Sequence, residues 1–404
     1  MLIVAGHARR PVSSIGTTDQ LRRNNLSNIL GLLHRNGPFS RAELTRMTGL
    51  NRSTIGAVVG DLTDLRLVYE RMPERVTRAG RPSPVVHIDD RSVAIAVNPE
   101  VDAVHVGLVA LGGQVLKHVR VETAKTPSAE QVVKLATTAI ADILAGQDRE
   151  LRVVGVGVAV PGQVRLSDGR LREATHMGWF EQPLAAMFER STGYPACAAN
   201  AAVLAMRAES TFGAVRDVDD LVYIIGGASG IGGGVLTGGR LLTGTDGYAG
   251  EFGHTFVRSG GAACHCGARG CFEAEVTQQQ LLDSVGLQAA GADRLAAALA
   301  KSTDPQVAEL VAHSLDLLGI VVRNAVNLFN PKVVMLSGFL AALHRAARDD
   351  SALVGEAIRS ARESVRIQDA ALGADQLMVG AAEIVFDELI ADPAACVALN
   401  AQTV

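Results

Sequence analysis

The stretch SVAIAVNPEVDAVHVGLVALGGQVLKHVRVE at 92–122 decides the fold. It holds three Val-rich segments, SVAIAVNP, DAVHVGLVAL and QVLKHVRVE, and Gly112-Gly113 separates the second from the third. Short runs rich in β-branched residues around a Gly-Gly pair are typical of strands joined by tight turns. The stretch therefore predicts three strands in an antiparallel meander.

The same pattern recurs further along the chain. A helix is expected over 128–146, and the buried strand LRVVGVGVAV follows it and ends at Pro161-Gly162. Gly-interrupted strands are then expected over 220–244, a long helix over 305–328, and another buried strand at KVVMLSG. Two βββαβα halves with Gly-rich ends facing each other predict a duplicated, actin-like or sugar-kinase-like α/β fold, in which ligands bind in the cleft between two lobes.

Composition limits the class of protein. With 404 residues and 48% apolar content, the chain has room for two or three domains and is not a disordered chain. No apolar run reaches the roughly 18 residues that cross a bilayer, and the opening apolar stretch is too short for a secretory signal. We therefore expect a cytoplasmic protein without a membrane partner.

Charge is distributed unevenly along the chain. The first ninety residues hold 13 Arg, no Lys and 8 acidic residues, whereas the remainder holds 25 basic and 34 acidic residues. A basic first segment on an acidic body favours contact with a polyanion. A solvated basic face is the alternative interpretation of the charge alone.

The first ninety residues also carry a helix-turn-helix pattern. Apolar residues at helical spacing predict a helix over 20–35. Ser40 and Glu43 form a capping box for a second helix that Gly49 ends, and Asn51 can cap a third helix with one apolar face. Two short helices joined by a Gly turn predict DNA binding, and an ordinary helical hairpin is the alternative.

In such a domain the N-terminal end of the last helix enters the major groove, and a wing contacts the minor groove. The segments RLVYERMP and VTRAGRPSPVVHID predict two strands around an Arg-rich loop, which would be the wing. The predicted DNA-contacting residues are Arg41, Asn51, Arg52, Ser53 and Thr54 in the helices and Arg78, Gly80 and Arg81 in the wing.

GEFGH at 250–254 and CHCGARGCFE at 264–273 together hold three of the five cysteines. His254, Cys264, Cys266 and Cys271 supply one nitrogen and three sulfurs, a set suited to tetrahedral Zn²⁺. Four protein ligands leave no position for an activated water, so we expect a structural site. The alternatives are reduced cysteines without a metal, or His265 in the place of one ligand.

These segments together resemble the ROK family of bacterial repressors and sugar kinases over nearly the whole chain. The resemblance is to the winged helix-turn-helix repressors that respond to sugars such as xylose or N-acetylglucosamine. The matching segments are SRAELTRMTGLNRSTI with the GRP-containing wing, GVGVAVPG, GASGIGGG, GEFGH, CHCGARGCFE and NLFNPKVVMLSG. We accordingly expect a winged helix-turn-helix domain over 1–90, a first lobe over 91–215 that a C-terminal helix at 380–404 completes, and a second lobe over 216–379 with the zinc loop at 250–275.

The resemblance also implies sugar-binding residues. In the kinases of the family, the Glu and His of GExGH and the Glu of GCxE contact the sugar. The ligand-binding residues implied for this chain are Glu251, His254, Glu273, Asn200 and Gly162. In the alternative, both glutamates only brace the zinc loop.

The resemblance fails at the residues that perform catalysis. The Asp-x-Gly-Gly-Thr loop of the family would fall at VNPEVDAV, where Asn98 takes the Asp position and the Gly-Gly-Thr is missing. In YPACAAN, which aligns with Asn-Asp-x-Asn, Ala198 takes the place of the catalytic Asp. Because Ala cannot accept a proton, we expect no catalytic residue, no phosphoryl transfer and no ATP cofactor.

The sequence therefore predicts a DNA-binding transcriptional repressor of sugar or carbon-metabolism genes. Its kinase-like part would sense a sugar or sugar phosphate and form a homodimer or tetramer on an inverted-repeat operator in double-stranded DNA. Two alternatives remain: a DNA-binding regulator that has lost its ligand, and an active sugar kinase with a DNA-binding appendage.

Overall fold

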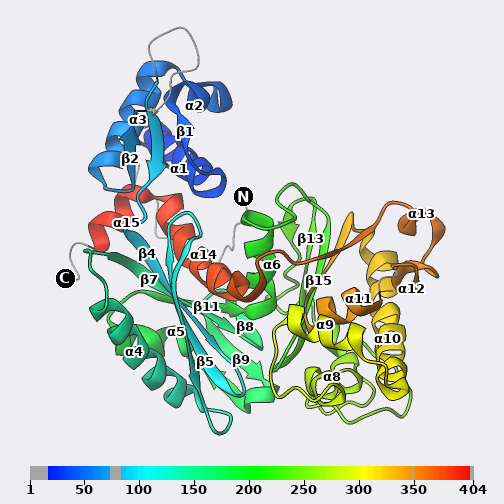
Figure 1. The fold of residues 1–404 in the computed structure, drawn as a ribbon. Coiled ribbons are helices and arrows are strands. Elements are labelled where there is room, and N and C mark those ends of the chain that lie inside the picture. The colour runs from blue at the N-terminus through cyan, green and yellow to red at the C-terminus, as the bar shows by residue number, and fades with distance from the viewer. Residues whose placement is uncertain (1–16, 73–82, 348–349, 401–404) are drawn as a thin grey trace.

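A computed structural model describes residues 17–72, 83–347 and 350–400 and contains two five-stranded sheets, one in each lobe (Figure 1). The first sheet has the order β11-β7-β4-β5-β6 and the second the order β14-β13-β12-β15-β16. The two orders are equivalent, which confirms the predicted duplicated α/β fold. The strands are β4 Ser92–Pro99, β5 Ala103–Ala110, β6 Val115–Glu122, β7 Arg152–Val160 and β11 Ala196–Asn200 in the first sheet, and β12 Leu221–Gly227, β13 Gly230–Thr237, β14 Arg240–Leu241, β15 Val333–Gly338 and β16 Arg366–Asp369 in the second.

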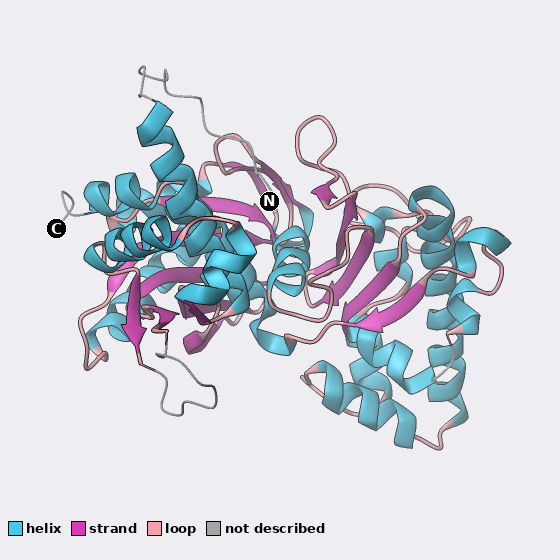
Figure 2. Ribbon diagram, turned by 90° about the horizontal axis from the view of Figure 1, so that it is seen from above, coloured by secondary structure: helices cyan, strands magenta, loops and turns pink. Residues whose placement is uncertain are grey.

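In the first lobe, β4, β5 and β6 form the predicted antiparallel meander, and β7 and β11 add to it in parallel. Helices α4 (Ala129–Ala145) and α5 (Leu184–Thr192) cover one face of this sheet, and α14 (Gln376–Ala391) covers the other. Between the lobes lies α6 (Ala201–Thr211), which contacts β11 of the first sheet and β12 and β13 of the second. Seen from above, the two sheets lie side by side with α6 between them (Figure 2).

A third, small sheet lies beside β11 in the first lobe. It consists of β8 (Gln163–Arg165), β9 (Arg170–Ala174) and β10 (Trp179–Gln182), in the order β10-β9-β8. The short helix η1 (Thr175–Met177) joins β9 to β10. This sheet carries side chains toward the space between the lobes.

The second lobe is built around α10 (Pro305–Phe329), the predicted long helix. Length and composition alone would let α10 cross a membrane, but 44% of its apolar window is buried, and ten of its residues pack inside the lobe. The remaining helices are η2 Phe252–His254, α7 Phe272–Glu275, α8 Gln278–Ser284, α9 Ala292–Lys301, α11 Phe339–Ala347, α12 Ser351–Val354, α13 Arg359–Arg362 and η3 Gly373–Asp375, and α15 Pro393–Asn400 follows α14.

The N-terminal domain has the predicted helices and strands. Ser40 and Glu43 form the capping box of the second helix, Gly49 ends it with φ 71°, and the Asn51 side chain accepts the Thr54 N–H at 2.8 Å to cap the third. The strands pair in the order β1-β3-β2. The elements are α1 Thr17–Asn36, α2 Arg41–Thr48, α3 Arg52–Asp64, β1 Phe39–Ser40, β2 Val68–Arg71 and β3 Val85–Ile88.

The apolar core of this domain continues into the first lobe. Leu30 and Leu33 of α1 and Ile55 of α3 belong to the same buried cluster as Phe386 and Leu389 of α14. The N-terminal domain is therefore packed directly on the first lobe, so a change in the position of α14 bears on its helices.

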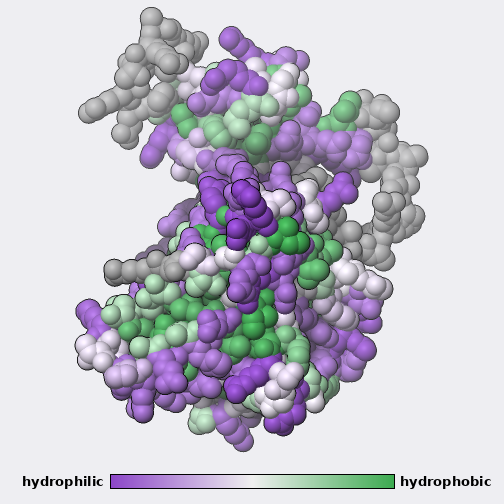
Figure 3. Space-filling model, turned by 90° about the vertical axis from the view of Figure 1, so that its right-hand side faces the viewer, coloured by the Kyte–Doolittle hydropathy of each residue, from purple (hydrophilic) through white to green (hydrophobic). Residues whose placement is uncertain are grey.

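Surface character differs between the two ends of the molecule. Figure 3 shows a mostly hydrophilic N-terminal domain above a second lobe on which apolar side chains are mixed with polar ones. In the second lobe, Leu328 and Ile358 are 75% and 62% exposed.

The contact between α14 and the first sheet allows no side chain at position 157. A Cβ placed on Gly157 of β7 would lie 1.8 Å from the Ala381 carbonyl oxygen. Gly157→Ala should therefore lower the free energy of unfolding by about 1–3 kcal/mol or more, because strand and helix must separate. Gly60→Ala in α3 is the matched control, since its Cβ would meet nothing within 4 Å. Urea unfolding measures both, and similar values for the two variants would contradict this close approach.

Candidate metal centre and interlobe cleft

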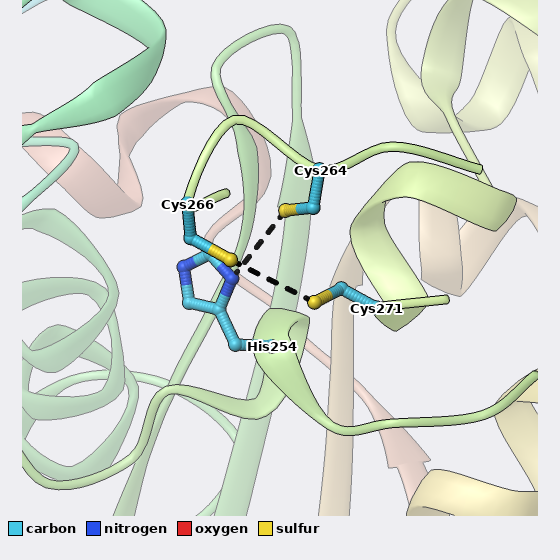
Figure 4. A group of neighbouring side chains, drawn as sticks. All are labelled: His254, Cys264, Cys266 and Cys271. Atoms are coloured by element: carbon cyan, nitrogen blue, oxygen red, sulfur yellow. Dashed lines mark hydrogen bonds between the residues drawn. The ribbon is translucent and has the colours of Figure 1, made fainter. Parts of the chain in front are cut away.

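Four side chains converge where η2 meets the loop that follows it (Figure 4). The ligand atoms of His254, Cys264, Cys266 and Cys271 all lie within 4.8 Å of one another. His254 Nδ1 is 3.7 Å from the Sγ of Cys264, and the Sγ atoms of Cys266 and Cys271 are 3.8 Å apart. All three cysteines are free thiols, so no disulfide explains their closeness.

The spacing of these atoms fits a tetrahedral metal ion. With Zn–S bonds of about 2.3 Å, the edges of a tetrahedron are about 3.8 Å long, close to both observed separations. Burial raises the pKa of Cys264 and Cys271, whereas a hydrogen bond from the Ala268 N–H lowers the pKa of Cys266. A bound cation would hold all three as thiolates. The donor set and its geometry are therefore compatible with a metal site.

Glu273 lies behind this cluster and is almost fully buried. Its Oε1 is 3.1 Å from His176 Nε2 and accepts a hydrogen bond from Cys264 at 3.2 Å, and its Oε2 accepts the Ile231 N–H at 3.3 Å. Burial alone would raise the pKa of Glu273, but the hydrogen bond and charge of His176 and the other donors hold it at about 2. Glu273 is thus an ionised carboxylate that joins the metal loop to both lobes.

The ring of His265 lies apart from the metal cluster. It is tilted against the ring of His176, with 4.3 Å between the centroids, and it is not among the four converging ligands. His265 therefore contacts His176 of η1 in the first lobe and does not belong to the candidate metal site.

A cavity of about 220 Å³ lies between the lobes beside the metal cluster. All five sequence-predicted ligand residues line it: Gly162, Asn200, Glu251, His254 and Glu273. Its other polar side chains are those of Asn98, Glu100, Gln163, Glu173, Thr175, His176, Ser229 and Cys266. The structure therefore brings the predicted ligand residues together at one cleft.

Asn200 and Gly162 form the wall of the cleft at the start of α6. The Asn200 side chain caps α6 by accepting the Val203 N–H at 3.1 Å, and its amide donates to the Gly162 carbonyl at 2.9 Å. A Cβ on Gly162 would lie 2.4 Å from the Glu173 carbonyl oxygen, so this position needs glycine. Asn200 therefore stabilises the start of α6 as well as lining the cleft.

The two positions at which the sequence departs from the kinase pattern are filled by side chains without acid–base chemistry. Ala198 is 6% exposed in β11 and does not line the cleft. Asn98 is buried, and its amide donates to the Ala159 carbonyl at 2.9 Å. Neither residue can take a proton from a substrate hydroxyl.

The loop after β4 makes a hydrogen bond to the second lobe. The Val101 N–H donates to the Ser229 hydroxyl of the second lobe at 3.3 Å. Beside it, burial and the negative charge of Asp102 raise the pKa of Glu100 to about 7. Ser229 therefore joins the two lobes at the mouth of the cleft.

The predicted DNA-contacting residues are placed as follows. Asn51, Arg52 and Ser53 are exposed at the N-terminal end of α3, and Thr54 is half-buried behind them. Arg41 is paired with Glu70 of β2, with 2.6 Å between Nε and Oε1, so it is held against its own domain. Arg78, Gly80 and Arg81 lie outside the described residues.

Sequence reasoning missed two titratable side chains that line the cleft, Glu173 and His176. Both come from the first lobe and belong to no motif, whereas Glu100, which also lines the cleft, lies in the VNPEVDAV segment. His176 reaches Glu273 across 97 residues of chain, a contact that no local pattern signals. Only the pairing of β8 with β9 brings Glu173 beside Gln163.

Comparison with known proteins gives one family and two kinds of relative. The model of the ROK family matches residues 94–388. The xylose repressor of Bacillus subtilis (strain 168) is 25% identical over 385 residues, which cover 92% of this chain and 97% of the repressor. A glucokinase of Thermotoga maritima is 30% identical over 250 residues, which cover 58% of this chain and 77% of the kinase.

Among solved structures, a ROK family transcriptional regulator described as a homologue of the E. coli MLC protein is similar over 95% of this chain and 99% of its own. The TM-score is 0.75 at 22% identity, a likeness that bears on the fold alone. The similarity includes the residues before 94, where the family model does not reach.

The metal cluster generates a direct prediction. Purified protein should contain about one zinc ion per chain, and Cys264→Ser combined with Cys266→Ser should abolish it. Loss of the ion frees the loop, so the melting temperature should fall by roughly 5–10 °C. Elemental analysis and calorimetry measure the two effects. Cys396→Ser, outside the cluster, should leave the metal content unchanged, and wild-type protein without any bound metal would refute the site.

Proposed function

The chain belongs to the ROK family, and on that basis we propose that it is a DNA-binding transcriptional repressor whose kinase-like lobes sense a small ligand. One arrangement supports the proposal: an N-terminal domain with the helices predicted for a helix-turn-helix packs on the first lobe, and the five predicted ligand residues line the cleft between the lobes. The relative that matches almost end to end is a repressor, whereas the kinase match covers little more than half of this chain. The target genes would serve sugar or carbon metabolism.

DNA recognition would use the exposed start of α3. Asn51, Arg52 and Ser53 project there, where short polar and basic side chains reach phosphates and base edges. The predicted wing residues Arg78, Gly80 and Arg81 would contact the minor groove. A symmetric dimer would place two such helices on an inverted repeat, and a protein that binds chromosomal DNA in a bacterium acts in the cytoplasm.

The lobes would not catalyse phosphoryl transfer. A kinase of this architecture needs a base for the sugar hydroxyl and backbone amides for the triphosphate. Ala198 cannot be the base, and Pro99, which has no N–H, stands in the early loop beside Glu100 and Asp102. We therefore propose a binding cleft without ATP.

The metal would be Zn²⁺ in a structural role. His254 and the three cysteines would fill its four positions and leave none for a reacting water. When bound, the ion would hold in place the loop that carries His254 and Glu273, both of which line the cleft. Zinc would then order the ligand site.

The cleft favours an uncharged polyol over a sugar phosphate. Four glutamates line it, Glu100, Glu173, Glu251 and Glu273, and no Lys or Arg is among the described lining residues. Carboxylates accept strong hydrogen bonds from hydroxyl groups but repel a phosphate dianion. Since a relative is named as a xylose repressor, D-xylose is the first sugar to test.

We propose three units along the chain. The winged helix-turn-helix domain would span 1–90, the first lobe 91–215, and the second lobe 216–379 with its metal loop. The packing of α14 on β4 and β7 supports assigning the C-terminal helices to the first lobe.

DNA binding is tested by selection from random duplexes. Wild-type protein should enrich an inverted repeat, and Arg52→Ala should weaken binding to it by roughly 10-fold or more, since a specific base or phosphate contact contributes about 1–3 kcal/mol. Arg149→Ala, on the first lobe, is the matched control. No enriched sequence, or equal affinity of all three proteins, would contradict the proposal.

Ligand sensing is tested by thermal shift with D-xylose, D-glucose, N-acetylglucosamine and their phosphates, because a ligand that binds only the native state raises the melting temperature. At least one unphosphorylated sugar should stabilise wild-type protein, and Glu251→Gln should abolish the shift. A response to phosphates alone would overturn the ligand class, and no response to any sugar would favour a regulator without a ligand. ATP and Mg²⁺ should give no sugar phosphate, whereas turnover at ordinary kinase rates would make the protein an enzyme.

A further inference from the structure

A buried polar side chain joins the N-terminal domain to the first lobe. His34, near the end of α1, has a fully buried side chain, and its Nε2 lies 2.8 Å from Oε1 of Glu383 in α14. Its ring packs edge-on against Phe212 and Phe386, with centroids 5.2 and 5.7 Å away. An imidazole in such surroundings keeps its position only while both ring nitrogens have partners.

The partners of His34 define its hydrogen-bonding state. The Gly112 N–H, in the turn between β5 and β6, donates to Nδ1 at 2.9 Å, so Nδ1 carries no proton. Nε2 must then be the protonated nitrogen, and it donates to Glu383. The ring is therefore held at both ends, by a turn of the first sheet and by a helix that packs on that sheet.

Glu383 also contacts α6. Its other carboxylate oxygen lies 3.8 Å from the guanidinium of Arg207, which also forms a two-pronged ion pair with Asp387. The side chains of Glu383 and Arg207 are 4% and 8% exposed. The contact between α6 and α14 is also close, because a Cβ on Gly380 would lie 2.2 Å from the Leu204 carbonyl oxygen.

The other end of α6 is the cleft. Asn200 caps the helix and lines the cavity. Arg207 lies seven residues further along α6, which is about 10 Å along the helix axis. On its second face α6 meets the other lobe, where a Cβ on Gly232 of β13 would be 2.9 Å from Ala202. A movement of either lobe at the cleft must therefore displace α6.

We propose that His34 is the positioning residue through which the cleft acts on the DNA-binding domain: α6 transmits displacement from Asn200 to Arg207, and Glu383 passes it to His34 and α1. This inference rests on the proposed function, whose regulation it specifies. The apolar contacts of α1 tolerate small shifts, whereas hydrogen bonds at both ring nitrogens do not. The position of α1 determines that of α3, because the two helices pack together.

Hydrogen exchange on the full chain tests this coupling without an operator or a sugar. Asn200→Ala removes the cap of α6, and the exchange of α6 should rise by about fivefold, as for a lost N-cap. The exchange rates of the amides at 26–36 in α1 should rise by a similar factor. In a His34→Leu/Glu383→Met background, which fills the space without hydrogen bonds, Asn200→Ala should raise exchange in α6 alone.

His34→Gln is the conservative control. The Gln amide can donate to Glu383 and its carbonyl can accept the Gly112 N–H, so transmission to α1 should persist. Two results would overturn the proposal. In the first, Asn200→Ala leaves the hydrogen exchange of α1 unchanged in the wild-type background. In the second, it still raises the exchange of α1 in the doubly substituted background. Because the readout involves neither DNA nor ligand, its failure leaves the repressor proposal standing, and failure of the DNA selection leaves this coupling intact.

Discussion

The close approach of α14 to the first sheet is the constraint on which the rest of the structure depends. The Ala381 carbonyl of α14 lies where a side chain on Gly157 of β7 would be. In the same way, the Leu204 carbonyl of α6 lies where a side chain on Gly380 of α14 would be. These contacts seat α14 between β7, α6 and the core of the N-terminal domain. Since helix and strand cannot slide past one another at such distances, three parts of the molecule share one rigid junction.

Local chemistry explains why much of this structure was predictable from the sequence. The capping residues Ser40 and Asn51 fix helix starts through neighbouring atoms, and the Val-rich runs around Gly112 fix the meander. The metal ligands lie within one short segment. By contrast, His34 meets Glu383 across 349 residues of chain, and Arg207 meets Asp387 across 180. The sequence around a single His inside a helix does not indicate its partner.

In the proposed function, the cleft binds a ligand and does not catalyse phosphoryl transfer. Glu251, His254 and Glu273 line the cavity, Asn98 lines it with its amide hydrogen-bonded to the Ala159 carbonyl, and Ala198 is buried in β11. A hydrogen bond from the Val101 N–H to the Ser229 hydroxyl joins the two lobes beside the cleft. In a regulator, such a cleft would use its binding energy to set the angle between the lobes rather than to drive phosphoryl transfer.

If the proposed function holds, a ligand in the cleft changes the affinity of the protein for DNA. The most direct measurement is operator affinity, on one preparation of the zinc-loaded protein, across a titration of the sugar that raises its melting temperature. We expect a saturable change in operator affinity of about 5- to 150-fold, and the affinity for sugar should change by the same factor when operator is present. Sugar and operator that bind together with unchanged affinities would contradict it.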